Sequence, residues 1–532
     1  MRRGTTLLLA AALVCGGAFA GGASAAPAPA KAVSKTPDGA TPLMQAAYAG
    51  DLAQAKRLLA NHADVNAVNA YGVNAMLLAS EASNTPLIEL LLKAGAKATS
   101  ANPDGETALH LVARSGNVDA AKLLLAHGAK VDARERFGNQ TPLMWASARR
   151  HPEMVELLAS KGADVNARSA VRDYQRVATA ESRAKFLDRG GLTPLMYAAR
   201  ENCGACVEVL LKHKVDLNMP DPAGVPPVSI AMMNGNWDIA KRLIEAGADV
   251  NQWDIFGQSP LHVATEGMGR RGDNNPLDSD EQQMQASGRD IVKLLVDRGA
   301  NPNQELFYKA PGRDTGVGRG LTPFLAACAS GDIEIVKLLL AHGADIKLAT
   351  SDGQGPIILA VGSRTGGTAN PGAQSAAPGV DFGNAQGVTS TRAGAGPPEE
   401  RTITLIKLLA ASGADVNLIA KRHFLQRTRG GSALHYAVRG GDKALIAALI
   451  DLGADVNAKD EDGLTALDYA MGRGFVPFLQ LAKAPNKDLA DALRSRGANV
   501  ELAKTPDWPP QGAPIGTAVF DAVLWPVDPV GG

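Results

Sequence analysis

The sequence predicts an all-α solenoid of about eleven helix–turn–helix repeats joined by β-hairpin-like fingers. A phrase of the type TPLMQAA recurs along the 532 residues, and the copies starting at Thr41, Asn74 and Thr107 are 33 residues apart. A second phrase, typified by AKLLLAHGAKVDA, carries an apolar stripe of helical period that ends at a glycine. A chain of this length exceeds one globular core, whereas stacked repeats escape that limit because each repeat contacts only its neighbours.

The start of the chain has the pattern of a secretory signal peptide. Met1 to Arg3 are positively charged, Leu7 to Ala20 form an apolar run, and Ala23-Ser24-Ala25 offers a cleavage site. We therefore expect residues 1–25 to be removed during export across the inner membrane, which predicts a periplasmic or secreted protein. An uncleaved N-terminal anchor is the alternative. No later run of about 20 apolar residues predicts an integral membrane segment.

The first helix of each repeat is predicted from its cap. A Thr or Ser stands before the helix, and a proline often follows at the first helical position, where its missing N–H costs nothing. An inward leucine comes next, and three residues later an alanine lets adjacent first helices approach closely. The second helix ends at a glycine except at His62 and Lys214, where we expect a strained or an alternative cap. After a linker at 26–36, the repeats are predicted to fill residues 37–500.

These two phrases resemble the ankyrin-repeat family over most of the chain, from about Pro37 to Val500. The resemblance implies a concave face, built from first helices and fingers, that binds another protein. In ankyrins the two variable positions before the turn between helices belong to this face. In this sequence they are occupied by Tyr48, Glu81, Arg114, Arg149, Arg200 and Glu201. The family also uses a histidine after the inward leucine to hydrogen-bond neighbouring repeats, which assigns that role to His110, His262 and His435.

Exposed aromatic and arginine side chains are the usual energetic anchors of protein interfaces. We therefore predict a non-catalytic interaction module or scaffold whose partner is a protein of unknown identity, and we expect the chain to be monomeric. A formal net charge of zero, from 54 basic and 54 acidic residues, argues against nucleic acid as the partner. The predicted binding residues on helix ends and fingertips are Tyr48, Tyr71, Arg114, Phe137, Arg149, Arg200, Trp253 and Phe256.

Five insertions interrupt the repeats. Three lengthen fingers, at 167–190, 304–319 and 418–429, and two separate the helices of one repeat, at 266–288 and 362–400. The last is rich in Gly, Ala, Pro and Ser, so we expect a mobile excursion that folding does not need. A proline-rich tail at 501–532 either covers the end or groove of the solenoid or binds a partner.

Two of the finger insertions are basic in a chain without net charge. The first contains Arg172 and Arg176, and the third contains Lys421, Arg422 and Arg427 with no acid. This local bias suggests an alternative function, the binding of a polyanion or an anionic envelope. The competing interpretation is that these are solvated loops whose charges merely keep them soluble.

The sequence offers no constellation for catalysis, so we predict no enzyme, no cofactor and no metal. Cys203 and Cys206 form a C-x-x-C at the start of a second helix, and Cys206 also aligns with a buried apolar column. They are therefore interpreted as a possible disulfide or as core residues, since no thioredoxin-like context or second zinc half-site accompanies them. Cys328 stands where other repeats have alanine and is interpreted as a core residue.

Overall fold

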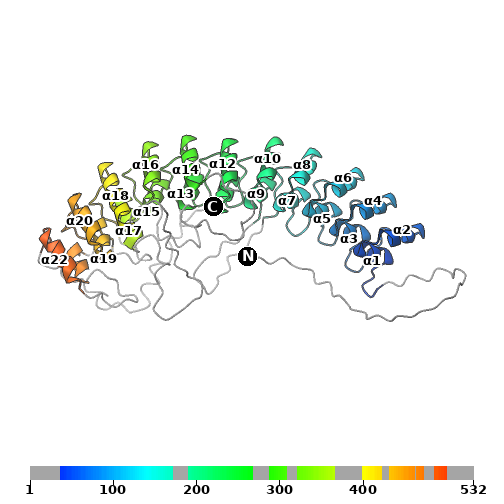
Figure 1. The fold of residues 1–532 in the computed structure, drawn as a ribbon, viewed down its shortest axis with the longest axis horizontal. Helices are drawn as coiled ribbons and strands as arrows, with labels where there is room; N and C mark the ends of the chain where they lie inside the picture. The colour runs from blue at the N-terminus through cyan, green and yellow to red at the C-terminus, as the bar shows by residue number, and fades with distance from the viewer. Residues whose placement is uncertain are drawn as a thin grey trace, which may run out of the picture.

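The computed structural model describes residues 36–171, 190–267, 287–307, 320–365, 398–421, 430–461, 463–472 and 485–499. Within these ranges twenty-two helices form eleven consecutive pairs, which stack side by side into an arc (Figure 1). The first helix of each pair lines the inner side of the arc, and the second helix lies on the outer side (Figure 1). The predicted all-α solenoid of about eleven repeats is confirmed.

The helices alternate along the chain. The first helices are α1 (Pro42–Ala49), α3 (Ala75–Glu81), α5 (Ala108–Ser115), α7 (Pro142–Ala148), α9 (Pro194–Arg200), α11 (Pro227–Met233), α13 (Pro260–Gly267), α15 (Pro323–Ser330), α17 (Pro356–Thr365), α19 (Ala433–Gly440) and α21 (Ala466–Ala470). The second helices are α2 (Leu52–Ala60), α4 (Thr85–Lys93), α6 (Val118–Ala126), α8 (Pro152–Ser160), α10 (Gly204–Lys212), α12 (Trp237–Glu245), α14 (Gly288–Asp297), α16 (Ile333–Ala341), α18 (Pro398–Ala411), α20 (Lys443–Asp451) and α22 (Lys487–Ser495).

The caps of the first helices form as the sequence predicts. The hydroxyl of Thr193 accepts a hydrogen bond from the N–H of Met196 at 3.3 Å, and that of Thr322 accepts from Leu325 at 3.2 Å. At the ends of the second helices, His62 and Lys214 have φ values of 58° and 57°. The other repeats place glycine there, which adopts positive φ without a steric penalty. The expected strained caps are therefore present in these two repeats.

The three buried histidines join neighbouring repeats. The imidazole Nε2 of His262 lies 3.1 Å from the carbonyl oxygen of Leu321, and its Nδ1 accepts from the backbone N–H of Ser259 at 3.1 Å. His110 makes the same contact to the carbonyl of Gln140, and His435 makes it to the carbonyl of Leu464, both at 3.1 Å. The stacking role implied for these residues is confirmed.

A second ladder, which the sequence reasoning missed, runs along the turns after the second helices. The side-chain oxygen of Asn251 accepts from the N–H of Asn301 at 2.8 Å, while its amide donates to the carbonyl of Gly299 at 3.0 Å. The same kind of bond recurs wherever the phrase ADVN or a close variant ends in Asn or Asp. Thr99 and Lys347 occupy this position in two repeats and break the ladder there. The recurring asparagine was the available signal.

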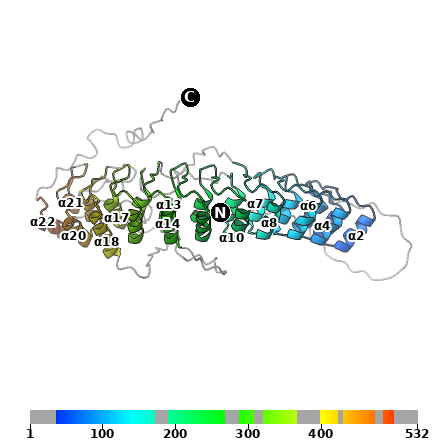
Figure 2. The same ribbon diagram turned by 90° about the horizontal axis from the view of Figure 1, so that it is seen from above.

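The loops that join successive repeats gather along one long edge of the array (Figure 2). Isolated antiparallel bridges close several of these fingers, including Ala101 to Thr107 and Lys459 to Thr465. In several described fingers a carboxylate or amide inside the loop completes the turn: Asp254, for example, accepts from the N–H groups of Phe256 and Gln258, both at 2.9 Å. The hairpin-like fingers are therefore held by their own side chains rather than by a sheet.

At two of the predicted insertions, the flanking helices extend a few residues into the predicted ranges. Helix α13 continues to Gly267 and α14 begins at Gly288, after Ser287 as its N-cap. Helix α17 continues to Thr365, and α18 begins at Pro398, so the two helices enter the predicted insertion 362–400 from both ends. Proline favours the first position of a helix because its φ is already helical. The middle of that insertion, whose mobility was expected, lies outside the described residues, as do residues 1–35 and the tail 501–532.

Candidate functional site

A hollow of about 420 Å³ opens where the ends of three first helices meet. It lies at the C-terminal ends of α5, α7 and α9, on helices that line the inner side of the arc (Figure 1). Three of the predicted binding residues, Arg114, Arg149 and Arg200, come together here from three successive repeats. The full lining is Arg114, Gln140, Trp145, Ala148, Arg149, Tyr197, Arg200 and Glu201.

The first wall of the hollow is an arginine stacked on tryptophan. The guanidinium carbon of Arg114 lies 5.6 Å from the ring centroid of Trp145, and the guanidinium also pairs with the Glu81 carboxylate. The ring of His110 packs edge-to-face against the same tryptophan, with ring centroids 5.3 Å apart. Burial lowers the pKa of His110 below its ordinary value, so this ring is neutral near pH 7. The stacking holds the arginine in place before any partner arrives.

The second wall is also an arginine over an aromatic ring, but here both residues belong to α9. The guanidinium carbon of Arg200 lies 5.1 Å from the ring centroid of Tyr197, and its Nε donates to Glu201 at 2.9 Å. Tyr197 is itself buried, with 6% of its surface exposed. The aromatic ring is therefore part of the fold, and the arginine that covers it is the group presented to solvent.

Gln140 joins the two walls, and the sequence reasoning did not identify it. Its Oε1 accepts from the indole Nε1 of Trp145 at 2.8 Å, and its Nε2 donates to the hydroxyl of Tyr197 at 2.7 Å. The buried carboxylate of Glu135 accepts from the backbone N–H of Gln140 at 2.9 Å and so positions it. The contact between Gln140 and Tyr197 spans 57 residues of sequence, which is why no local pattern revealed it.

The rim of the hollow carries an excess of positive charge. Arg149 is the C-cap of α7 and is exposed, and Arg150 follows it with a φ of 63°. In the part of the chain that the structure describes, neither guanidinium pairs with a carboxylate or donates a hydrogen bond. The other two arginines pair with the carboxylates of Glu81 and Glu201.

The remaining predicted binding residues do not join this hollow. Tyr48, Tyr71 and Phe137 are exposed, at 66%, 67% and 77%, but they lie on separate repeats and none of them lines the hollow. Trp253 is only 49% exposed because it packs edge-to-face on Phe307, with ring centroids 5.2 Å apart.

Phe256 and the basic fingers stand apart as well. Phe256 is half-buried, and its carbonyl accepts from the N–H of Phe307 at 2.8 Å. Lys421 is exposed at the base of its finger, where its N–H donates to the carbonyl of Asp352 at 2.7 Å. The other predicted basic residues, Arg172, Arg176, Arg422 and Arg427, lie outside the described residues.

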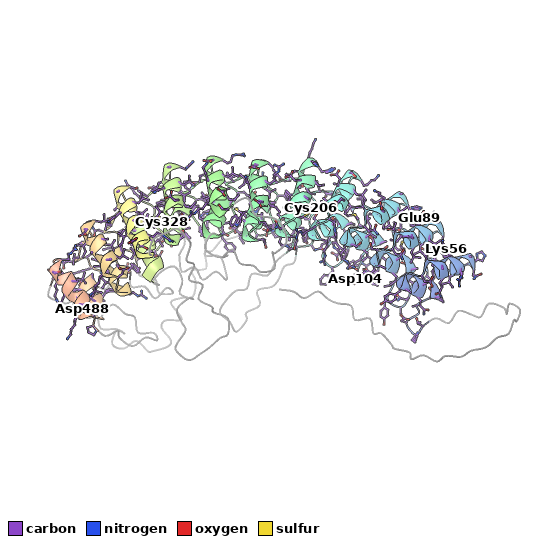
Figure 3. All side chains as sticks on the ribbon, viewed as in Figure 1. Lys56, Glu89, Asp104, Cys206, Cys328 and Asp488 are labelled. Carbon is purple, nitrogen blue, oxygen red and sulfur yellow. A yellow bond between two sulfur atoms is a disulfide. The ribbon has the colours of Figure 1, made fainter. Side chains whose placement is uncertain are left out.

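The cysteines are arranged for structure. Cys203 is the N-cap of α10 and is bonded to the buried Cys206 as a disulfide. Cys328 is a free, fully buried thiol on α15, and burial raises the pKa of this thiol far above its usual range. Figure 3 shows Cys206 and Cys328 at well-separated places along the array. Neither place lies in the hollow.

In the described ranges, no group of three His, Cys, Asp or Glu side chains gathers at a distance suited to one metal ion. None of the helices in those ranges combines the length and apolar character needed to cross a bilayer.

Models of ankyrin repeats match the chain along most of the array. The model for three copies matches residues 7–102, 77–169 and 283–368, the model for many copies matches 228–273 and 434–482, and the single-repeat model matches 190–222 and 256–305. The chain belongs to the ankyrin-repeat family. Ankyrin arrays are in general non-catalytic modules that bind other proteins, which is the function class that the sequence predicted.

Several characterised proteins are similar to parts of the chain. The mouse B-cell lymphoma 3 protein homolog is 28% identical over 226 residues, covering 42% of this chain and 40% of that protein. The chicken nuclear factor NF-kappa-B p105 subunit is 29% identical over 313 residues, covering 56% of this chain and 25% of that protein. The chain therefore spans less than half the length of these relatives.

Two further similarities are more limited. The glycerophosphocholine phosphodiesterase gde1 of Schizosaccharomyces pombe is 36% identical over 163 residues, which cover 30% of this chain and 12% of that enzyme. Among solved structures, the human ASB11 ankyrin repeat domain is 22% identical with a TM-score of 0.37, covering 49% of this chain and all of that domain.

Proposed function

We propose that the protein is a non-catalytic binding module that captures a partner protein on its concave face, with the hollow between α5, α7 and α9 as the centre of the interface. The observation that carries this proposal is the convergence of Arg114, Arg149 and Arg200 around Trp145 and Tyr197. Arginine, tryptophan and tyrosine dominate the energetic centres of protein interfaces.

The order already present in the hollow supports the same centre. Binding normally costs free energy because flexible side chains must be immobilised at the interface. Here Arg114 and Arg200 are held over aromatic rings, and Gln140 ties the two rings together. The exposed fingertip aromatics Tyr71 and Phe137 lie outside this arrangement and would extend the interface at its edge.

Photo-crosslinking in intact cells tests this function. We expect a photoreactive amino acid at Glu201, on the rim of the hollow, to give discrete crosslinked partner proteins that mass spectrometry identifies. The matched control is the same amino acid at Lys56, which is exposed on the outer helix α2 (Figure 3). Equal labelling from both positions, or labelling from Lys56 alone, would place the interface elsewhere.

The alternative function, binding of a polyanion through the basic fingers, predicts a different pattern. Glutamate at Arg172, Arg176, Lys421, Arg422 and Arg427 would then abolish capture, and added salt would weaken binding steeply. Loss of capture in this variant, together with no crosslinks from Glu201, would favour the alternative over the concave hollow. We propose a monomeric protein that does not bind nucleic acid.

We also propose that the protein works in the periplasm or outside the cell. The charged start, the apolar run and the small residues before Ala26 support export. The disulfide between Cys203 and Cys206 is consistent with an oxidising compartment, since cytosolic proteins rarely keep such bonds. We expect mass analysis of the mature protein from the periplasmic fraction to find Ala26 at the N-terminus. Retention of Met1 in cytosolic protein would contradict export.

A further inference from the structure

We infer that the hollow between α5, α7 and α9 recognises an acidic segment of its protein partner, whose carboxylates pair with the arginines on the rim. This inference rests on the proposed function and adds to it the chemistry of the ligand. Several arginines at this place have hydrogen-bond donors that are not used within the described structure.

Arg149 and Arg150 are two adjacent arginines at the end of α7. Both are exposed at the end of α7, and among the described residues neither has a carboxylate partner. A guanidinium presents five N–H donors in a planar fork that matches the two oxygens of a carboxylate. The guanidinium of Arg149 lines the hollow, and Arg150 follows it in the chain, so this end of α7 favours a ligand that brings carboxylates.

Arg114 adds directed donors to the same rim. Its Nη2 donates to Glu81 while the guanidinium lies over Trp145, which fixes the plane of the fork. One carboxylate takes at most two of the five donors, so the fork retains capacity for a second carboxylate. Trp145 and Ala148 provide apolar surface that suits the methylene groups of an acidic side chain.

The acidic residues of the rim discriminate between kinds of anion. Glu201 lines the hollow and Glu81 stands against Arg114. A phosphate chain carries a dense run of negative charge and would be repelled by both carboxylates. An acidic peptide spaces its charges by several ångströms and can place each one against an arginine. The hollow therefore fits an acidic protein segment better than it fits a polyphosphate.

Fluorescence anisotropy of the full chain with short labelled peptides tests this inference. We expect a peptide of alternating glutamate and alanine to bind at least roughly tenfold more tightly than the matching glutamine and alanine peptide. Arg149→Gln should weaken the glutamate peptide about tenfold, and Arg149→Lys should weaken it less because the charge remains. The matched control is Arg57→Gln, which removes an exposed arginine on the outer helix α2 with the same change in net charge.

Three results would overturn the acidic-segment assignment. Equal affinity for the two peptides would show that carboxylates are not recognised. Equal weakening by Arg57→Gln and Arg149→Gln would show that only the overall charge matters. The third result is displacement of the labelled peptide by inorganic tripolyphosphate at a far lower concentration of negative charge than unlabelled glutamate peptide requires. That result would assign the rim to phosphate. Each of these leaves the protein-binding function to be judged by crosslinking from Glu201, because a partner without acidic segments would still crosslink there.

Discussion

Replacing Phe324 with alanine is expected to lower the free energy of unfolding by about 3–5 kcal/mol, as is typical when a buried phenylalanine is truncated. Phe324 lies on α15 at the inward position that most first helices fill with leucine, and none of its surface is exposed. The truncation removes apolar burial and leaves a cavity. The neighbouring helices α13 and α17 can close that cavity only in part, since they are held by their own stacking contacts.

Hydrogen exchange and urea denaturation together check this result. Because each repeat contacts only its neighbours, faster exchange should appear first in α13, α15 and α17 and not in α1. The matched control is Phe137→Ala, on a fingertip with 77% of the phenylalanine exposed, which should change stability by no more than about 0.5 kcal/mol. Similar losses for the two variants, or a uniform increase of exchange along the array, would contradict the nearest-neighbour account of stability.

Acidification is expected to destabilise the array through its buried histidines, and His262 should contribute most. Burial lowers the pKa of His262 from 6.5 to about 4, because a charged imidazole there would lose its hydration. Its Nδ1 also accepts a hydrogen bond from the N–H of Ser259, a role that the protonated ring cannot fill. The folded protein therefore keeps His262 neutral at pH values where the unfolded chain protonates it.

The direction of the pH effect follows from this difference. Between pH 6.5 and 4 the unfolded chain binds a proton that the folded chain does not, so stability is present above pH 6.5 and is lost as the pH falls. A shift of this size corresponds to roughly 3 kcal/mol at pH 4 for His262 alone. Burial also lowers the pKa values of His110 and His435, so these residues add to the loss of stability as the pH falls below their ordinary pKa.

Urea denaturation of the parent and of His262→Gln, at several pH values between 4 and 7.5, isolates this contribution. Glutamine does not titrate, so the stability of the variant should fall less steeply with decreasing pH, even if the variant is less stable at pH 7.5. Only the difference between the two slopes is attributed to His262, since other groups also titrate in this range. Identical slopes would show that protonation of His262 does not drive the acid destabilisation.

The sequence predicted the arginines of the candidate site but not the side chains that surround and position them. Arg114, Arg149 and Arg200 were selected because they occupy the two variable positions before the turns, which are a property of the repeat. Gln140, Trp145 and Tyr197 were overlooked because nothing local distinguishes them from the variable residues of other repeats. The same limitation affected Trp253, which was predicted as a binding residue, whereas Phe307 covers part of its ring.

The repeats follow from the sequence because their signals are local and periodic. A threonine that caps a helix, an alanine that permits close packing and a glycine that ends a helix each act within a few residues of themselves, and repetition of the phrase removes ambiguity. The hollow depended on tertiary structure, since the stacking of successive repeats brings Arg114, Arg149 and Arg200 to one place. The hydrogen bonds of Gln140 then join Trp145 in its own repeat to Tyr197 in the next. Contacts between residues so far apart in the sequence form only when the repeats stack. The curvature and register of the stack decide which side chains meet.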